Sequence, residues 1–261
     1  MPVPRSAAAS RRASRPIDGP PTDDRRMTLR LLAWNIRQGG GTRLARIIAA
    51  IAQHEADVLV ISEYRGRESG ERLRAALAAT GYAHVTGATP PAGGNGVLIA
   101  ARQAFDDGGP LTDTVSEPYR IVRAYFGALR IYGVYMPNLL KKVPYWQALI
   151  AALAAEPLQA EALAIGDFNT CRAYIDEPGA IDSCAHFMDG VAEIGFCDLW
   201  RRRYPDGREF SWYSTRGNGF RIDHAFLSPA LVGRTGEIRY SHDERTSGLS
   251  DHSALLLDFD I

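Results

Sequence analysis

Residues 29–63 read LRLLAWNIRQGGGTRLARIIAAIAQHEADVLVISE, and this stretch predicts a strand, a helix and a second strand in succession. A continuous apolar run opens the stretch and ends at Asn35, which is typical of a buried strand with a polar residue at its end. The next apolar residues recur at the spacing of an amphipathic helix: Leu44, Ile47, Ile48 and Ile51. A second apolar run then ends at Glu63. This order of elements favours an α/β fold in which helices cover a sheet.

The same alternation continues through the rest of the chain. Apolar patterns predict three further helices, within residues 71–79, 146–153 and 185–194. They also predict strands at residues 82–86, 96–101, 120–126, 129–135, 163–166, 223–227, 237–240 and 254–259. Gly127 and Ala128 lie between two of these strands and are typical of a tight hairpin, so antiparallel pairing accompanies the parallel pairing. We therefore expect mixed sheets covered by helices in one domain, residues 27–261.

The composition excludes several classes of protein. A chain of 261 residues with 46% hydrophobic residues can bury a large core, which excludes disorder as its main state. Its apolar stretches end well short of the roughly 20 residues that a membrane-spanning helix needs, so we expect no membrane partner. Thirty basic and 30 acidic residues give a net charge of zero, so the total charge does not by itself indicate nucleic-acid binding.

The charge is unevenly distributed along the chain. Residues 1–26 contain six arginines and three acidic residues, which leaves 24 basic and 27 acidic residues in the remainder. The segment is rich in Pro, Ser and Arg and has no apolar core of a secretory signal. We predict a disordered basic N-terminal tail at residues 1–26; a start codon assigned too early, with Met27 as the true start, fits equally well.

Three cysteines indicate the compartment. Cys171, Cys184 and Cys197 are an odd number, lie thirteen residues apart and lack the close pairs of a zinc or redox motif. A reducing compartment is the simplest interpretation, so we expect a cytoplasmic protein. The sequence indicates no protein partner, and we expect a monomer.

Polar residues stand where the predicted strands end or in the short turns beside them. They are Asn35, Glu63, Tyr135, Asn138, Asp167, Asn169, Asp223, Asp251 and His252. In layered α/β folds such residues meet in one cleft, because loops at one edge of a rigid sheet lie close together. We therefore expect a single site.

Three of these residues offer hard oxygen ligands. Glu63 and Asp251, with the carbonyl oxygen of Asn35, suit Mg²⁺ or Mn²⁺, and no cysteine or histidine cluster favours zinc. A phosphate is then the natural substrate. His252 beside Asp251 could be oriented by Asp223 and kept charged against a developing phosphorane. Asp167 and Asn169, in the tight turn 166–169, could align and deprotonate an attacking water.

Seven short stretches, taken in order, resemble the endonuclease/exonuclease/phosphatase superfamily. They are WNIRQGG (34–40), VISEYR (60–65), NGVLIA (95–100), YMPN (135–138), IGDFN (165–169), GFRIDHAFLS (219–228) and LSDH (249–252). Together they span nearly all of residues 29–261. Within that superfamily, residues 198–231 are most similar to the exonuclease III/apurinic endonuclease branch, which has an Asp-x-x-Arg, a Pro, a Ser-Trp-aromatic and an Arg-Ile-Asp in the same order.

The resemblance implies a fold and an activity. The fold would be a four-layer α/β sandwich of the DNase I type, with two stacked mixed β-sheets flanked by helices. The activity would be that of an Mg²⁺-dependent phosphodiester hydrolase. Glu63 would bind the metal with support from Asn35 and Asp251. The resemblance assigns the remaining roles as follows: Asp167 activates water, Asn169 and Tyr135 hold phosphate oxygens, and Asp223 with His252 stabilises the transition state.

The branch also implies a substrate. DNA would be the partner, cleaved at abasic sites or trimmed from its 3′ end, and Trp212, Phe220 and Ile222 would form an apolar pocket for a base-less sugar. Asn138 would contact the phosphate. Arg221 is expected beside the pocket as a further substrate-binding residue, within a basic neighbourhood that could contact a phosphate strand: Arg201, Arg202, Arg203, Arg208 and Arg216. Core packing for the aromatic residues and a solvated face for the arginines are the open alternatives.

Some positions depart from the family pattern. Ser62 replaces the usual Gln before the metal-binding Glu, Arg65 stands near the usual Lys, and Arg37 occupies a position that often carries Asp or Asn. These departures weaken any two-metal proposal. The stretch between Trp212 and Arg221 is shorter than in typical DNA-repair members, so we expect weaker binding to duplex DNA. A phosphoesterase acting on a small molecule or a lipid head group is therefore the alternative function.

Overall fold

A computed structural model describes residue 1 and residues 28–181 and 184–260 of the protein. Apart from residue 1, the basic tail predicted for residues 1–26 lies outside the described residues. Among the described residues, no helix has both the length and the apolar character needed to cross a lipid bilayer.

Twelve strands form two mixed sheets of six strands each within the described residues. The first sheet has the order β13 (Thr235–Ser241), β14 (Ala254–Asp260), β1 (Thr28–Asn35), β2 (Val58–Arg65), β4 (Asn95–Ala101) and β3 (His84–Val85). The second sheet has the order β5 (Asp106–Pro110), β6 (Ile121–Phe126), β7 (Leu129–Tyr135), β8 (Glu161–Asp167), β12 (Asp223–Leu227) and β9 (Cys197–Asp198). A separate ribbon pairs β10 (Trp212–Tyr213) with β11 (Gly219–Phe220).

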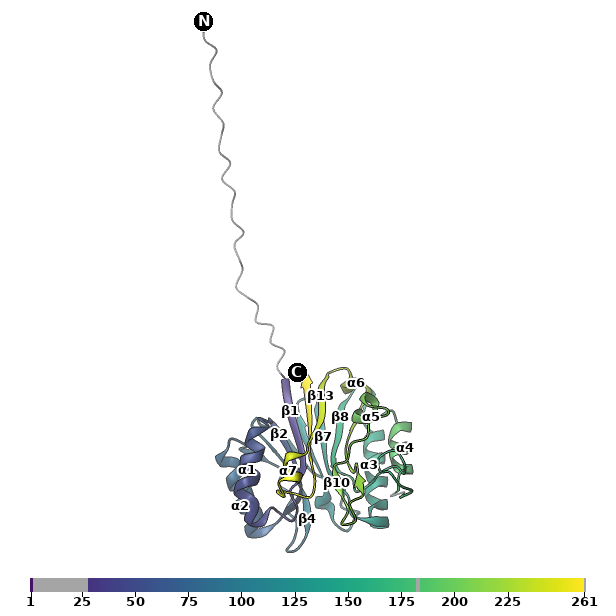
Figure 1. The fold of residues 1–261 in the computed structure, drawn as a ribbon. Helices are drawn as coiled ribbons and strands as arrows, with labels where there is room; N and C mark the ends of the chain where they lie inside the picture. The colour runs from purple at the N-terminus through teal and green to yellow at the C-terminus, as the bar shows by residue number, and fades with distance from the viewer. Residues whose placement is uncertain (2–27, 182–183, 261) are drawn as a thin grey trace.

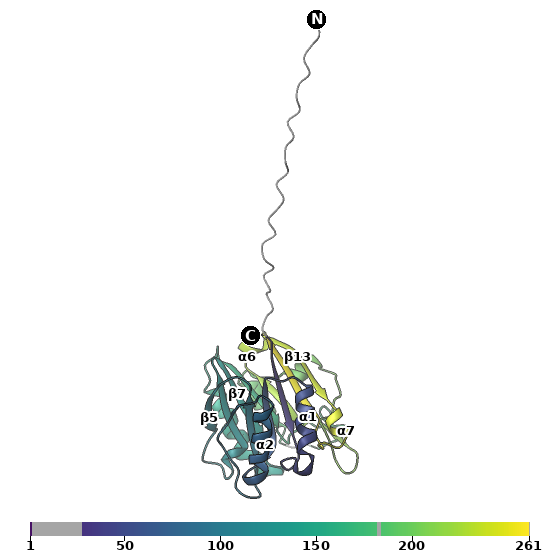
Figure 2. The same ribbon diagram turned by 90° about the vertical axis from the view of Figure 1, so that its left-hand side faces the viewer.

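Helices cover the outer face of each sheet (Figures 1 and 2). The helices α1 (Leu44–Gln53) and α2 (Arg67–Ala79) pack on the first sheet, and α3 (Val143–Ala154) and α4 (His186–Glu193) pack on the second. Shorter helical segments lie in the connections: α5 (Leu199–Arg203), α6 (Pro229–Val232), α7 (Asp243–Thr246) and the 3₁₀ turns Gly41–Arg43, Pro118–Arg120 and Leu139–Lys142. The four-layer sandwich predicted from the sequence is confirmed.

The two sheets stack face to face through a buried apolar layer. Val60 and Ile99 of the first sheet belong to the same core cluster as Ile131 of the second sheet, and all three side chains are fully buried. Gly133 of β7 lies where the sheets approach closely, because a Cβ atom there would stand 3.1 Å from Cγ1 of both Val60 and Ile99. A residue larger than glycine would crowd these two side chains, so the absence of a side chain at Gly133 allows the two sheets to pack at this spacing.

Strand pairing brings the polar strand ends to one edge of the sandwich. The strands β1 and β2 run parallel with Asn35 opposite Ser62, and β7 and β8 run parallel with Tyr135 opposite Asp167. The strand β12 runs antiparallel to β8 and begins with Asp223 opposite Asp167. The ends of strands from both sheets therefore surround one cleft, as the sequence predicted.

Most helices and strands lie where the apolar pattern of the sequence predicts them. The differences occur in segments whose sequence pattern is weak. The strand β5 was not predicted, because its sequence DDGGP has low β propensity; it forms as an edge strand that pairs with β6 through a register shift. Of the strand predicted at residues 82–86, the structure has only His84–Val85 as β3, and the backbone N–H of Thr86 adds one bond to Ile99 of β4. The helix predicted at residues 71–79 begins earlier, at Arg67.

Candidate active site

Glu63 stands at a local irregularity of β2. The pairing of β2 with β4 shifts between Ser62 and Tyr64, and Glu63 between them has a φ of 57°, in the left-handed region that a non-glycine residue rarely adopts. Its carboxylate accepts hydrogen bonds from the backbone N–H of Gln38 at 2.6 Å and from the Asn95 amide at 3.3 Å. The sheet irregularity and these donors direct a carboxylate into the cleft.

Asn35 connects the two halves of the site. Its Nδ2 donates to Asp167 Oδ2 at 2.9 Å and lies 3.3 Å from Glu63 Oε1, while its Oδ1 accepts the backbone N–H of Arg37 at 2.9 Å. Asn35 belongs to the first sheet and Asp167 to the second, so this side chain links the sheets at the reactive edge. The amide oxygen that the sequence assigned to a metal has a second lone pair beyond the bond to Arg37.

Asp167 is buried at the centre of the site. Its Oδ1 accepts the backbone N–H of Asn169 at 2.9 Å, and Asn169 itself has a left-handed φ of 47°. Burial raises the pKa of Asp167 to about 7; His252 opposes this shift and Asp223 adds to it. The raised pKa makes this carboxylate a stronger base than an ordinary aspartate.

His252 and Asp223 form a buried pair across the sheet boundary. His252 Nδ1 lies 2.9 Å from Asp223 Oδ2, and His252 Nε2 lies 3.9 Å from Asp167 Oδ2. Burial alone lowers the pKa of His252, but the carboxylates of Asp223 and Asp167 outweigh it and raise the pKa to about 10. The raised pKa favours the cationic form of the imidazole at neutral pH, and the ring is held by Asp223 and turned toward Asp167.

Tyr135, Asn138 and Asn169 complete the polar wall of the cleft. Tyr135 is buried, and burial followed by the charges of Glu63 and Asp167 raises the pKa of its phenol to about 12. The phenol therefore keeps its proton at neutral pH and can donate it in a hydrogen bond. Asn169 Nδ2 donates to the carbonyl oxygen of Met136 at 2.8 Å, which ties the turn after β8 to the turn after β7.

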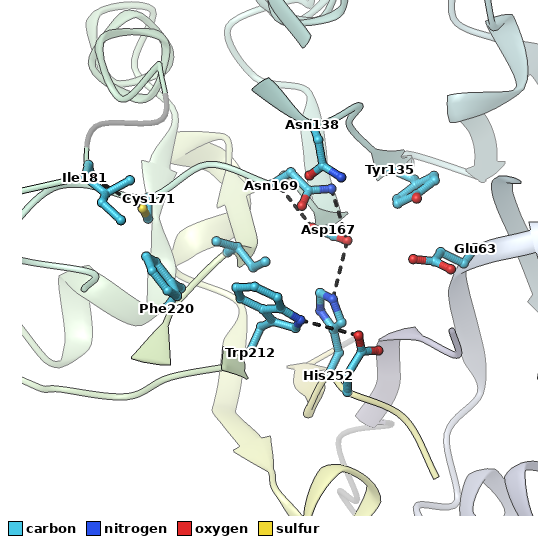
Figure 3. Close-up of a pocket in the computed structure, with 12 residues that line it drawn as sticks. Glu63, Tyr135, Asn138, Asp167, Asn169, Cys171, Ile181, Trp212, Phe220 and His252 are labelled. Carbon is cyan, nitrogen blue, oxygen red and sulfur yellow. Dashed lines mark hydrogen bonds and ion pairs between the residues drawn. The ribbon is translucent and has the colours of Figure 1, made fainter. Parts of the chain in front are cut away.

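These groups surround a pocket of about 420 Å³, which Figure 3 shows with its lining residues. The polar residues of the lining are Glu63, Tyr135, Asn138, Asp167, Asn169, Asp251 and His252, and the apolar ones are Cys171, Ile181, Trp212, Phe220 and Ile222. In Figure 3, Cys171, Ile181 and Phe220 lie on one side of Asp167 and Glu63 lies on the other. The pocket thus has a charged side and an apolar side.

Most of the residues predicted from the sequence meet here. Eleven of the thirteen predicted site residues line the pocket or, in the case of Asp223, bond to a lining residue, and Asn35 lies directly behind Glu63 and Asp167. Trp212, which was predicted in the pocket wall, donates from Nε1 to Asp251 Oδ2 at 3.4 Å. Cys171 and Ile181 were missed, because the loop that carries them has no motif. Only the position of Cys171, two residues after Asn169, could have indicated it.

The prediction for Arg221 was wrong. Its side chain is fully buried and forms ion pairs with Asp176 and Asp198, so it cannot reach a substrate. The physical reason is the alternation of side chains along extended backbone: Phe220 and Ile222 face the pocket, and the residue between them faces the opposite way.

Much of the predicted basic neighbourhood is also used inside the protein. Arg201 donates to Asp176 and to the carbonyl oxygens of Tyr204, Pro205 and Gly207. Arg203 donates to the carbonyl oxygens of Gly236 and Thr235. The exposed arginines of this stretch are Arg202, Arg203, Arg208 and Arg216, although Arg203 bonds the carbonyl oxygens named above. Fewer cations therefore remain for a phosphate strand than the sequence suggested.

Two sets of side chains could hold a divalent cation. Asp167, Asp223 and His252 bring possible ligand atoms within 4.8 Å of one another. His252 Nδ1 is already bonded to Asp223 Oδ2, however, and the neighbouring carboxylates raise the pKa of His252, which favours the protonated imidazole that cannot act as a ligand. Glu63 and Asp251 both line the pocket, and Asn35 lies beside Glu63, with its Nδ2 toward Glu63 Oε1 and its Oδ1 bonded to the backbone N–H of Arg37. The two carboxylates offer the oxygen ligands that Mg²⁺ or Mn²⁺ prefers. The second set is therefore the better candidate.

Known proteins resemble this chain over most of its length. Residues 32–252 match the endonuclease/exonuclease/phosphatase family. No curated protein matches the chain significantly. An AP endonuclease from Archaeoglobus fulgidus is 23% identical, with a TM-score of 0.77 over 89% of this chain and 100% of that one.

Two structures from Neisseria are equally similar in fold. The 3′-5′ exonuclease NExo from Neisseria meningitidis is 25% identical, with a TM-score of 0.76 over 89% of this chain and 100% of that one. The 3′ phosphatase NExo from Neisseria, bound to a product DNA hairpin, is 23% identical with the same TM-score and coverage. At these identities the likenesses show that the fold is shared.

Proposed function

Because this chain belongs to the endonuclease/exonuclease/phosphatase family, we propose that it is a divalent-metal-dependent phosphodiester hydrolase that acts on DNA, at abasic sites or at 3′ ends. One observation carries the proposal. Asp167 and His252 lie side by side in one pocket, at the boundary between its charged and its apolar side, and Asp167 Oδ2 is 3.9 Å from His252 Nε2. A general base and a cation beside a pocket are the groups that water attack on a phosphodiester requires.

The residues divide the reaction between them. Asp167 takes the proton of the attacking water as the water oxygen bonds to phosphorus, and the bond from phosphorus to the leaving oxygen breaks. Charged His252, held by Asp223 at 2.9 Å, donates a hydrogen bond to the negative charge that develops on the phosphate oxygens. Tyr135 and Asn169 hold those oxygens in place, and Asn138 contacts the phosphate from the rim of the pocket.

The metal site rests on the chemistry of its donors. Glu63 and Asp251, with Asn35, would hold a magnesium or manganese ion on the charged side of the pocket. A bound ion would supply positive charge against the phosphate oxygens. The residues of the protein itself bind the sugar, orient the water and move the proton.

DNA is the favoured substrate for two reasons. The apolar side of the pocket, with Trp212 and Phe220 at a ring-centroid distance of 5.6 Å, suits a deoxyribose without a base. The structurally similar Neisseria 3′ phosphatase NExo was solved with a product DNA hairpin, and we carry that class of substrate to this chain. We expect a protein that acts as a cytoplasmic monomer without a protein partner.

A phosphoesterase acting on a small molecule or a lipid head group is the second candidate. The internal bonding of Arg201 and Arg221 favours it, because these two guanidinium groups are spent on Asp176 inside the protein and fewer cations remain for a long phosphate strand. The protein would then hydrolyse a small diester in the same pocket with the same catalytic residues.

An incision assay separates the two candidates. The full chain with Mg²⁺ is incubated with an end-labelled duplex that contains one tetrahydrofuran abasic analogue, and separately with a recessed 3′ end. We expect cleavage at the analogue or removal of 3′ nucleotides, and loss of both in Asp167→Asn. Failure on both DNA substrates together with turnover of bis(p-nitrophenyl) phosphate would reject DNA in favour of a small diester. Full activity of Asp167→Asn would reject the role of Asp167.

A further inference from the structure

Arg221 lies between two residues of the apolar side of the pocket and points away from it. Phe220 and Ile222 line the pocket, while the Arg221 side chain is fully buried. Its Nε and Nη2 donate to Asp176 Oδ1 at 3.0 and 2.6 Å, and its Nη1 and Nη2 donate to the two oxygens of Asp198 at 3.1 and 2.6 Å. One guanidinium thus bridges two carboxylates. We call Arg221, Asp176 and Asp198 the Arg221 cluster.

Asp176 belongs to the loop that supplies the rest of the apolar side. This loop begins with Cys171 and ends with Ile181, and both residues line the pocket. The backbone N–H of Arg221 donates to the carbonyl oxygen of Asp176 at 2.8 Å, in addition to the bonds between their side chains. The same arginine therefore fixes the segment of Phe220 and Ile222 and the loop that faces it.

Ile181 is held by hydrogen bonds within the loop, from the residue next to Asp176. Its side chain is 51% exposed, so contacts with the core cannot hold it as they hold a buried residue. The neighbour of Asp176, Glu177, is buried and accepts the backbone N–H of Ile181 at 2.8 Å and that of Gly179 at 2.7 Å. The tip of the loop is thus held through a turn whose base is Asp176.

Asp198 fixes the cluster to the second sheet. It ends the edge strand β9 and accepts the backbone N–H of Arg201 at 3.1 Å at the start of α5. The Arg221 guanidinium also lies over the ring of Trp200, 4.9 Å from its centroid. Because Arg221 and Asp176 are fully buried, the cluster can fix the position of the loop relative to the sheet.

We propose that the Arg221 cluster is a positioning group that determines which sugar the pocket admits. The cluster holds the Cys171–Ile181 loop close to Phe220 and Ile222. A deoxyribose without a base then fits in the pocket, and a nucleotide that keeps its base does not. The inference rests on the proposed function, since it assigns the selectivity of that same pocket. None of the three residues touches the substrate. Releasing the loop widens the pocket and weakens the discrimination.

The test is a ratio of rates measured with the full chain and Mg²⁺. Asp176→Asn keeps the shape of the side chain and removes the charge that Arg221 bonds. We expect the ratio of incision at a tetrahydrofuran site to cleavage of the undamaged duplex to fall by about tenfold, the scale on which pocket shape discriminates between substrates. Ile181→Ala shortens a half-exposed side chain without touching the cluster, and we expect it to lower the same ratio even if Asp176→Asn fails to fold.

The matched control is Glu156→Gln. Glu156 is also a buried carboxylate, which bonds Arg130 and Tyr132 toward the far end of β7 from the pocket. Its loss lowers the melting temperature without changing the ratio. An unchanged ratio in both Ile181→Ala and folded Asp176→Asn overturns the inference while leaving the proposed function intact. If the wild-type protein trims 3′ ends but does not incise at the abasic analogue, the inference is rejected and the proposed function stands. If it does neither, the proposed function is rejected, and the inference with it.

Discussion

Replacing Asp198 with asparagine will lower the stability of the folded protein at neutral pH, and the loss will shrink in acid. The Asp198 side chain is 7% exposed and accepts two hydrogen bonds from Arg221, at 3.1 and 2.6 Å. Burial alone raises the pKa of Asp198, but Arg221 outweighs it and holds the pKa well below the usual range. The folded state therefore binds the proton more weakly than the unfolded chain does.

The sign and size of the effect follow from this difference. A carboxylate whose folded pKa is depressed stabilises the protein above its unfolded pKa, about 3.9, and the contribution is lost as the pH falls through the folded pKa. Removing one partner of a buried ion pair costs about 3–5 kcal/mol, and we expect about 3 kcal/mol here because Arg221 keeps Asp176. That loss corresponds to a fall in Tm of about 6–12 °C for a chain of this size.

Urea unfolding of the wild type and of Asp198→Asn, followed by circular dichroism at several pH values, measures the difference in the free energy of unfolding. We expect the difference to be constant from pH 7 to about pH 5 and to shrink by about 1 kcal/mol by pH 3. Asp258→Asn is the control, because the Arg30–Asp258 pair is more exposed and is expected to contribute about 1 kcal/mol or less. A difference that is as large at pH 3 as at pH 7 would refute the reasoning.

Three further changes test the site itself. Asp223→Asn removes the carboxylate from His252 Nδ1, so we expect kcat to fall about 100-fold or more with an unchanged circular dichroism spectrum; a fall of less than twofold contradicts the pair's role. Lys142→Met removes a buried amine that donates to the carbonyl oxygen of Asn169. We expect kcat to fall about tenfold with little change in KM, because the turn that carries Asn169 loses its support. A change in KM alone would contradict a role of Lys142 in positioning this turn. Chelation with EDTA is expected to abolish activity, and Glu63→Gln to raise the Mg²⁺ concentration for half-maximal activity at least about tenfold; wild-type turnover in excess EDTA excludes the metal.

The polar residues at strand ends could be predicted because their position follows from pairing. A buried strand shows as an apolar run in the sequence, and Asn35, Glu63 and Asp167 each end such a run. Parallel pairing then places these ends at one edge, which requires no knowledge of side-chain packing. The contacts across the sheet boundary, such as Asn35 to Asp167 at 2.9 Å, depend on how the sheets stack and could only be inferred from the family resemblance.

The apolar side of the pocket was harder to predict. Ile181 reaches the pocket through a loop held by Asp176 and Glu177, and no local pattern in the sequence indicates where such a loop turns. The error at Arg221 was avoidable, since placing Phe220 and Ile222 in one wall already turns the residue between them to the opposite face. Its two buried acidic partners are 23 and 45 residues away in the chain, so their identity was not available from the sequence.

The absence of a side chain at Gly133 has a consequence for the pocket, which begins two residues further along β7, at Tyr135. The groups that we propose for the reaction come from both sheets, with Glu63 in β2 of the first and Asp167 and Asp223 in β8 and β12 of the second. Their separation is therefore a property of the interior, where a single methyl group at Gly133 would stand 3.1 Å from Val60 and Ile99. Packing in the middle of the core therefore sets the distance between the groups that the two sheets bring to the pocket. A screen for altered turnover then has targets in the buried core as well as around the substrate.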